Sequence, residues 1–165
     1  MNIFAQVMGV FAIITWVMSI ILKNKKDIIL SQVVANAIYS VEYTILKADS
    51  AASMNFLSFI RLIIYYIFAR KNKELPKIIL IVFSFLVIVL GIFTYNGLLS
   101  IIPIIITLFY TYSLWQDNLK ITRIIYVVSA FIWIYYNFQV GAFVGIIGNM
   151  LEIIAGIGAL IKYHK

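Results

Sequence analysis

The chain has 165 residues, of which 64% are hydrophobic, and a formal net charge of +7. Soluble proteins contain roughly 45–50% apolar residues, so this chain has too little polar surface to cover a water-soluble globule, and lipid must be its main solvent. The absence of cysteine excludes disulfides, thiolate metal sites and a cysteine nucleophile. The basic residues fall in short clusters between apolar runs, which argues against nucleic acid as a partner.

Seven apolar runs follow one another along the chain, separated by short turns, and each has about the length of a membrane-crossing helix. The first run is not preceded by basic residues as a signal peptide is, so we expect it to be a membrane helix as well. The sequence therefore predicts an all-α integral membrane protein with a single transmembrane domain over 1–165. The predicted helices are 3–22, 28–46, 51–69, 78–94, 98–115, 121–138 and 142–162.

The turns between these helices alternate between basic and nearly uncharged. Lys and Arg are retained in the cytoplasm, so we expect the basic turns and the C-terminus to be cytoplasmic and the N-terminus to lie outside. Only an odd number of helices fits this alternation. The basic residues assigned to the cytoplasmic side are Lys23, Lys25, Lys26, Arg70, Lys71, Lys73, Lys77, Lys120, Arg123, Lys162 and Lys165.

An internal repeat relates the two ends of the chain. A shift of 94 positions superposes the first three predicted helices on the last three without a gap, which divides the chain into a repeat at 1–72, a linker helix at 73–97 and a repeat at 98–165. Chance matching of two isoleucine-rich segments is the alternative. Two parallel three-helix repeats (3+1+3) are typical of transporters that bind solute between the repeats. Pairs with matching side chains include Ser19 with Ser113, Asn24 with Asn118, Lys26 with Lys120, Asn55 with Asn149 and Lys71 with Lys165.

Two charged residues fall near the middle of predicted membrane helices. An ionisable group at mid-bilayer costs about 2.5–3.5 kcal/mol on insertion scales, so Arg61 and Glu152 should face the bundle interior and have partners. They share a depth, which favours an ion pair or gate between the repeats. The pair could equally be a purely structural lock, and Glu42 is an alternative partner for Arg61.

Polar and aromatic residues form a stripe on the second and sixth predicted helices. Rings supply contact area and amides fix orientation, so facing stripes would suit a flat or polyhydroxylated solute; hydrogen bonding between helices is the alternative reading. The stripes consist of Gln32, Asn36, Tyr39 and Tyr43, and of Tyr126, Ser129, Trp133 and Asn137. The candidate substrate-binding residues are Tyr39, Tyr43, Trp133, Asn137, Asn55 and Asn149.

Small residues and a proline suggest packing faces and hinges. Glycines recur on one face of the last predicted helix around Glu152, which is typical of close helix packing. The shift matches Gly9 to Pro103, and both are candidate hinges. No phosphate loop, nucleophile elbow or zinc-binding run is present, so we expect neither an enzyme nor a bound cofactor or metal.

One pattern of residues spans nearly the whole chain. It consists of Ala5, Gln6, Gly9, Arg61, Trp133, Asn137, Phe138, Gly141, Ala142, Gly145 and Glu152. This pattern resembles the YgjV family of bacterial inner-membrane proteins, and the resemblance implies a bacterial inner-membrane location. The triplet, linker and triplet layout is in turn similar to SWEET and PnuC transporters, in which a solute site lies between two three-helix units.

Taken together, these patterns favour a small-solute transporter or facilitator in the lipid bilayer. Its solute would be neutral or zwitterionic, such as a sugar, a nucleoside or a vitamin precursor. Proton coupling through Glu152 is a further alternative. The competing hypothesis is a membrane scaffold or accessory subunit whose polar groups only join helices. Either one could form a homo-oligomer.

Overall fold

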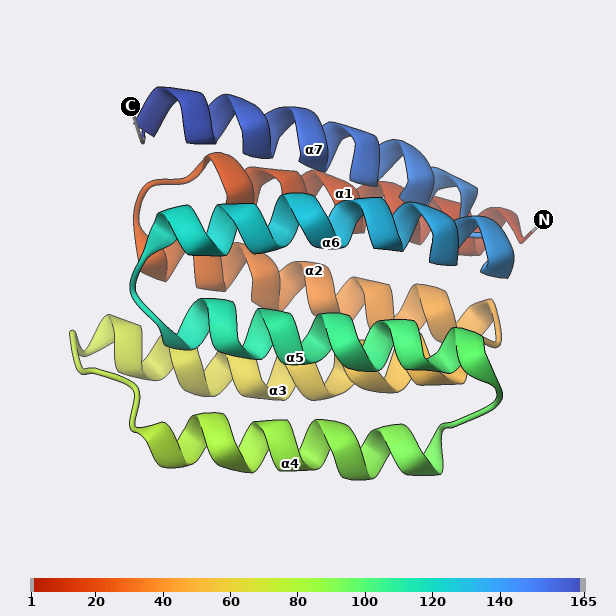
Figure 1. Ribbon diagram of the computed structural model, residues 1–165. Helices are drawn as coiled ribbons and strands as arrows, with labels where there is room; N and C mark the ends of the chain where they lie inside the picture. Colours follow the sequence, from red (N-terminus) through yellow and green to blue (C-terminus); the bar gives the residue numbers. More distant parts are fainter. Residues whose placement is uncertain (1, 164–165) are drawn as a thin grey trace.

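In the computed structural model, which describes residues 2–163, the chain folds into seven α-helices and one short 3-10 turn (Figure 1). Every predicted helix is present, and no predicted boundary is wrong by more than three residues. The predicted all-α fold with seven membrane helices is therefore confirmed. The elements are α1 (Ile3–Ile21), α2 (Lys25–Ile45), α3 (Asp49–Arg70), α4 (Lys77–Phe93), η1 (Leu98–Ser100), α5 (Ile101–Trp115), α6 (Leu119–Val140) and α7 (Phe143–Tyr163).

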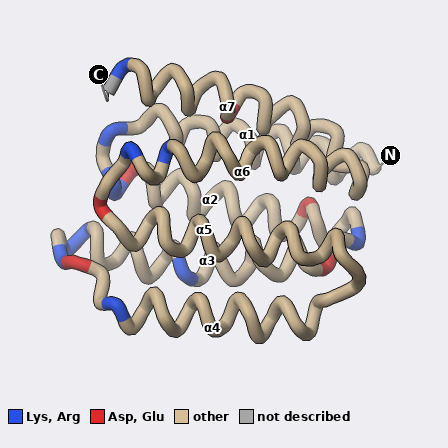
Figure 2. Tube along the Cα trace, in the orientation of Figure 1, with Lys and Arg blue, Asp and Glu red and all other residues tan. Residues whose placement is uncertain are grey.

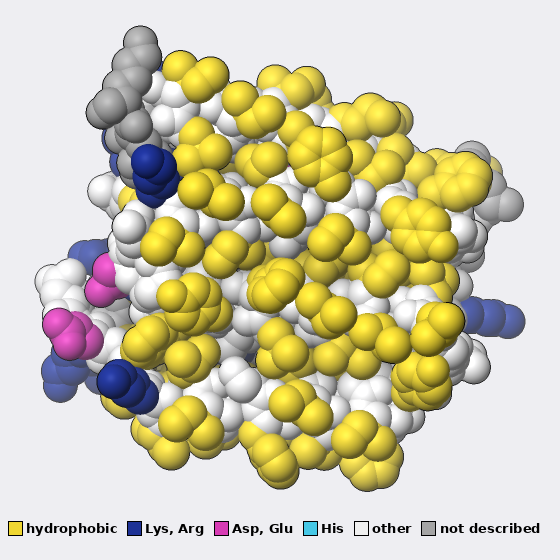
Figure 3. All heavy atoms as spheres, in the orientation of Figure 1, with side chains coloured by type: hydrophobic (Ala, Val, Ile, Leu, Met, Phe, Trp, Pro, Cys, Tyr) yellow, Lys and Arg dark blue, Asp and Glu magenta, His cyan; other side chains and the backbone are white. Residues whose placement is uncertain are grey.

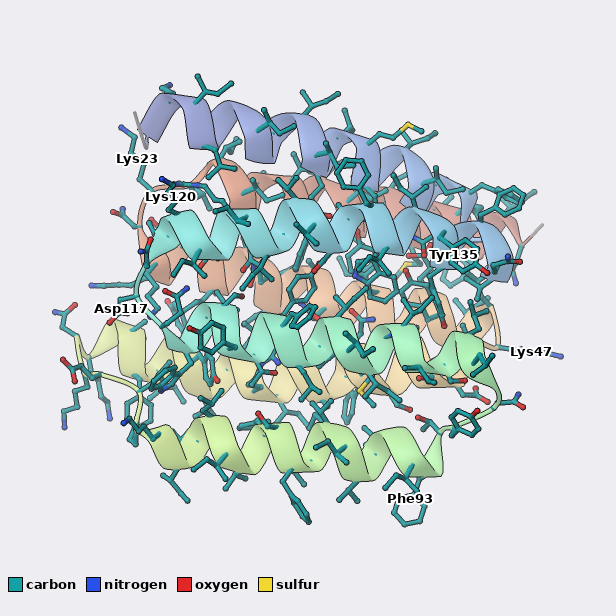
Figure 4. All side chains as sticks on the ribbon, viewed as in Figure 1. Lys23, Lys47, Phe93, Asp117, Lys120 and Tyr135 are labelled. Carbon is teal, nitrogen blue, oxygen red and sulfur yellow. The ribbon has the colours of Figure 1, made fainter. Side chains whose placement is uncertain are left out.

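The exterior of the bundle is suited to lipid. Among the described residues, six helices are long and apolar enough to cross a membrane, and α4 is a shorter apolar helix. The 17 residues of α4 rise about 26 Å at 1.5 Å per residue, close to the roughly 30 Å of a bilayer core. Apolar side chains cover the middle of the visible face (Figure 3), and Phe93 of α4 points away from the bundle (Figure 4).

Several helices end at residues that satisfy or redirect the backbone. The Asn118 side chain accepts the backbone N–H of Lys120 at 3.0 Å and so caps the start of α6. Gly141 adopts a left-handed conformation with φ 76° and ends α6, which lets α7 begin two residues later. Pro76 immediately precedes α4. These local signals explain why the turns are so short.

Six of the helices close into a ring around a central seam. In ring order they are α1, α2, α3, α5, α6 and α7, with α7 packed back on α1, whereas α4 packs outside the ring against α3 and α5. The first three helices and the last three thus pack most closely at two places, where α3 contacts α5 and where α7 contacts α1. The space enclosed by the ring lies between these two halves.

Charged residues collect at the two ends of the bundle (Figure 2). One end carries most of the lysines and arginines, and Lys25 at the start of α2 forms a salt bridge there with Asp117. Lys47 extends from the opposite end (Figure 4). The start of α1 and the end of α7 lie at opposite ends of the bundle, as an odd number of crossings requires (Figure 1). Lys165, the predicted counterpart of Lys71, lies outside the described residues.

Candidate functional site

The polar stripes of α2 and α6 meet in the centre of the ring. Gln32 Nε2 donates to the Tyr126 hydroxyl at 2.6 Å, and the Tyr43 hydroxyl donates to Asn137 Oδ1 at 2.7 Å. All four side chains are buried. In each bond the partners are 94 positions apart, which is the shift of the predicted repeat. Residues close to a two-fold axis contact their own counterparts, so these bonds support two equivalent halves that face one another.

The two seams between the halves follow the same shift. At the first seam, Ser50 Oγ of α3 donates to the Ser100 carbonyl at 3.0 Å. At the second, the backbone N–H of Val144 in α7 donates to Gln6 Oε1 at 3.1 Å. The shift carries Ser50 to Val144 and Gln6 to Ser100, so the two contacts are equivalent. The role of Gln6 was not predicted, although its polar counterpart at position 100 was a usable signal.

Aromatic rings pack around these central hydrogen bonds. Tyr43 stacks on Trp133 with centroids 5.9 Å apart and on Tyr39 with centroids 6.1 Å apart. The structure thus brings together the three predicted aromatic residues. Trp16 and Tyr110, which are also related by the shift, lie 5.4 Å apart between α1 and α5. Sequence reasoning missed this pair, because neither residue belongs to a polar stripe.

A small cavity of about 30 Å³ lies among these side chains, with contributions from six helices. A water molecule needs roughly 10–15 Å³ of such space, so the cavity has room for water but not for a sugar or a nucleoside. Ten of its twelve lining residues form five pairs related by the shift. These pairs are Trp16 with Tyr110, Tyr39 with Trp133, Tyr43 with Asn137, Asn55 with Asn149 and Ser58 with Glu152; the other two lining residues are Asn36 and Thr107. We call this space the central cavity.

A directional set of hydrogen bonds runs along one wall of the central cavity. The Tyr43 hydroxyl donates to Asn137, Asn137 Nδ2 donates to Asn149 Oδ1 at 2.8 Å, and Asn149 Nδ2 donates to Glu152 Oε2 at 3.2 Å. We call these four residues the relay. Every donor in it points towards the Glu152 carboxyl, which is 1% exposed. Glu152 Oε1 has no hydrogen-bond partner among the described residues.

The opposite wall does not repeat this arrangement. Asn55 Nδ2 donates to the Ala51 carbonyl of its own helix at 2.8 Å, and Asn36 Nδ2 donates to the Gln32 carbonyl at 2.8 Å. Asn55 lines the central cavity, but its amide group is not part of the relay. Asn55 and Asn149 both line the central cavity but form different hydrogen bonds.

The ion pair predicted between Arg61 and Glu152 is not formed in this structure. Arg61 is 2% exposed, donates to the Thr107 carbonyl at 3.3 Å and to Thr111 Oγ1, and lies over the ring of Tyr65. The residue of α3 that corresponds to Glu152 is Ser58. Arg61 lies three positions after Ser58 on α3, and three residues turn a helix by about 300°. Its side chain therefore points past the central cavity and towards α5.

Glu42, the alternative partner of Arg61, is also unpaired. It is 1% exposed, and both of its carboxyl oxygens lack hydrogen-bond partners among the described residues. It lies against Gly9, where an added Cβ would be 2.6 Å from Glu42 Oε1. Gly9 therefore has a packing role, which its prediction as a hinge did not include. Within 2–163, no three His, Asp or Glu side chains are placed to hold a metal ion.

Pro103 lies in the first turn of α5, which begins at Ile101. Backbone N–H groups in a first turn have no acceptor within the helix, so proline costs no helical hydrogen bond there and needs no kink. Pro103 is buried. Because α5 is continuous through Pro103, the structure gives no support to its prediction as a hinge.

A larger cavity of about 660 Å³ opens at the basic end of the bundle. The turns after α1, α3 and α5 line it, with Lys23, Lys25, Lys26 and Lys73 among its residues. Along α3, Tyr65 faces this basic-end cavity, Ser58 faces the central cavity, and Arg61 lies between them. The layer of Arg61 and Tyr65 therefore separates the two spaces.

Comparison with known proteins identifies one family. The model of the family Imp-YgjV, described as bacterial inner membrane protein, matches residues 3–165. No curated protein and no solved structure matches the chain, so the similarity to SWEET and PnuC transporters rests on the layout of the sequence alone. Since the match covers almost all of the chain, this multi-pass protein belongs to the Imp-YgjV family of bacterial inner-membrane proteins.

Proposed function

We propose that this protein is a transporter or facilitator for a small solute, which binds in the central cavity between the two halves. The observation that carries the proposal is the composition of that cavity, in which five pairs related by the shift of 94 positions face one another. A space on the axis between two equivalent halves changes its access when the halves rock, as in transporters built from repeats. Its walls of rings and amides are suited to orienting an organic solute.

The proposed orientation places the basic end of the bundle in the cytoplasm and the N-terminus outside. The positive-inside rule supports it, because the lysine-rich turns gather at one end while Lys47 and Asp49 nearly balance at the other. The basic-end cavity then serves as a cytoplasmic vestibule. The side chains of Arg61 and Tyr65 form the inner end of this vestibule and act as an inner gate.

In the present conformation, buried side chains pack on both sides of the central cavity. Arg61 and Tyr65 lie towards the basic end. A cluster of buried residues lies towards the other end, where Ala48, Ala51 and Ala142 pack beside Tyr136. A cavity of about 30 Å³ cannot hold a sugar-sized molecule, so solute entry requires the halves to separate at one seam.

Uptake into proteoliposomes tests this proposal. The purified protein would be reconstituted and offered a panel of labelled sugars, nucleosides, vitamins and small amines, with empty liposomes as the blank. We expect Asn149→Ala to reduce uptake of the transported solute strongly. Met150→Ala is the matched control on the same helix, because Met150 is 52% exposed to lipid. Flux that is absent for the whole panel, or equal in the two variants, would count against the proposal.

The scaffold hypothesis is favoured by one observation, namely that direct hydrogen bonds join the halves and leave little empty space. The absence of cysteine allows a direct distinction. A single cysteine at Ser58, which lines the central cavity, should react with a membrane-impermeant thiol reagent if the halves open. A cysteine at Ser113, which is buried and outside the cavity, is the control. Equal protection at both positions would favour a static scaffold.

A further inference from the structure

The central cavity contains a buried carboxyl group with no basic side chain beside it. Glu152 lies at mid-helix and is 1% exposed, the Trp16 side chain lies beside its carboxyl group, and Oε1 has no hydrogen-bond partner among the described residues. Its other oxygen accepts from Asn149. The orientation of the relay presents Glu152 as an acceptor, since each preceding member donates towards it. A buried acceptor without a donor is costly, so Oε1 marks a position that a ligand can satisfy.

No basic side chain can supply that partner from within the site. The twelve residues that line the central cavity include no lysine, arginine or histidine. Arg61, the buried cation closest in depth, donates to Thr107 and Thr111 and lies on the ring of Tyr65. The lysines of the described chain lie at the ends of the bundle (Figure 2). A positive charge beside Glu152 would therefore have to come from outside the protein.

The remaining walls are suited to an organic cation. Trp16, Tyr39, Tyr110 and Trp133 present aromatic rings to the same space as Glu152. A cation over an aromatic face gains about 0.5–2 kcal/mol, and rings grouped around a carboxylate are the usual way of recognising quaternary ammonium groups. A hydrated metal ion would prefer oxygen ligands on several sides, whereas here the space around the carboxylate is bounded largely by carbon.

We infer that the solute is a small organic cation, of the quaternary ammonium or N-alkylpyridinium type, with its charge beside Glu152 and its apolar groups against the rings of Trp16, Tyr110 and Trp133. This inference rests on the proposed function and replaces the neutral or zwitterionic solute that the sequence suggested. The cavity is smaller than such a cation, so the bound state needs the halves to separate slightly, as the transport cycle itself does. Hydroxyl groups on the solute can bond to Asn55 and Asn149.

A matched pair of probes tests the charge directly. Choline and 3,3-dimethylbutan-1-ol have nearly the same shape, but only choline carries a positive charge. Apparent Kd values would be measured for the purified protein in nanodiscs from the rise in Tm with probe concentration. We expect choline to bind at least about tenfold more tightly than the alcohol, in line with a cation–π and charge contribution of roughly 1.4 kcal/mol or more. N-methylpyridinium and uncharged pyridine form a second pair with a flat ring.

Two carboxyl variants locate the effect. Glu152→Gln keeps the shape and removes the charge, so it should strongly reduce the preference for the cation and leave only the part that the rings supply. Glu42→Gln is the matched control, because Glu42 is equally buried and unpaired but does not line the central cavity. It should keep the preference. If Glu152→Gln does not fold, the comparison of the two probe pairs on the unmodified protein decides the question alone.

Several results would overturn the inference, and they differ from those that refute transport. Equal binding of each cation and its neutral counterpart, or the same rise in Tm with sodium chloride alone, would exclude a site for organic cations. If neutral solutes are nevertheless taken up by proteoliposomes, the transporter proposal stands and only the solute class is wrong. If choline binds with the expected preference but never crosses the membrane, the site stands and the proposed function falls.

Discussion

The contact between Gly145 and Asn137 allows a quantitative test of how tightly the relay is held. Gly145 lies on α7, and a methyl group built on it would be 2.7 Å from Asn137 Nδ2 and 3.1 Å from Asn137 Cγ. Asn137 cannot withdraw freely, because it accepts from Tyr43 and donates to Asn149. Replacing Gly145 by alanine therefore either strains the α6–α7 contact or breaks both hydrogen bonds.

The expected cost follows from these two contributions. Overpacking a tight contact costs about 1–3 kcal/mol, and each hydrogen bond between membrane helices contributes roughly 0.6 kcal/mol. Because only one of these two outcomes occurs, Gly145→Ala should destabilise the fold by about 1–3 kcal/mol relative to a glycine-to-alanine change without contacts. Gly158→Ala is that reference on the same helix, because a Cβ at Gly158 meets no atom within 4 Å. Both changes replace glycine by alanine within a helix, which stabilises the helix by up to about 1 kcal/mol in each case, so this contribution cancels in the comparison.

The assay is reversible unfolding in mixed micelles, followed by circular dichroism as the fraction of denaturing detergent rises. Both variants would be measured beside the unmodified protein, and the difference between them isolates the contact at Gly145. If the two variants differ by less than about 0.5 kcal/mol, Asn137 yields without cost. The relay would then be loosely held, and the hydrogen bonds of Asn137 would not be fixed in the folded protein.

Three further predictions concern single groups and topology. Tyr43→Phe removes the hydroxyl that starts the relay and should cost roughly 0.6 kcal/mol of unfolding free energy, whereas Tyr112→Phe, at a ring 46% exposed to lipid, should cost nothing measurable. Arg61→Met should change the free energy of unfolding by less than about 1 kcal/mol, since similarly shaped apolar residues often replace buried charges without cost. It should nevertheless alter solute uptake. A loss of stability above roughly 3 kcal/mol with normal uptake would instead assign Arg61 a structural role. Reporter fusions at Asn96 and Asn118 should report the outside and the cytoplasm respectively, and the same compartment for both would refute the proposed orientation.

Hydropathy predicted the number of helices and their order because each crossing needs about 20 apolar residues in lipid. It placed the start of four helices one to three residues too late, and the second and sixth show the cause. The second helix was expected to begin at position 28 and begins at Lys25, and the sixth was expected at 121 and begins at Leu119. An apolar run reports where the chain enters the hydrocarbon, whereas a helix continues into the interface until a cap such as Asn118 ends it.

The site was predicted in part for a related reason. Periodicity along one helix tells which residues share a face, so the contact of Tyr39 and Tyr43 with Trp133 could be expected. It does not tell which helix that face meets. Arg61 and Glu152 share a depth but point to different neighbours, since α3 packs on α5 whereas α7 packs on α1 and α6. The order of helices in the ring is a tertiary property, and no pattern within one helix encodes it.

There is a physical reason why some residues that the shift pairs near the axis differ in chemical type, as Glu152 differs from Ser58. A residue close to the axis contacts its own counterpart, so two identical charged groups there would repel each other in a medium of low dielectric constant. Glu152 faces Ser58 across the central cavity, and no second carboxylate lines it. The same geometry favours a donor opposite an acceptor, as in the bond between Tyr43 and Asn137. A pair of neighbouring aromatic rings such as Trp16 and Tyr110 meets no such conflict. If the halves rock about this axis, the single carboxylate makes the site chemically one-sided while access alternates between its two ends, so a cation would travel with its charge held on the α7 wall throughout the cycle.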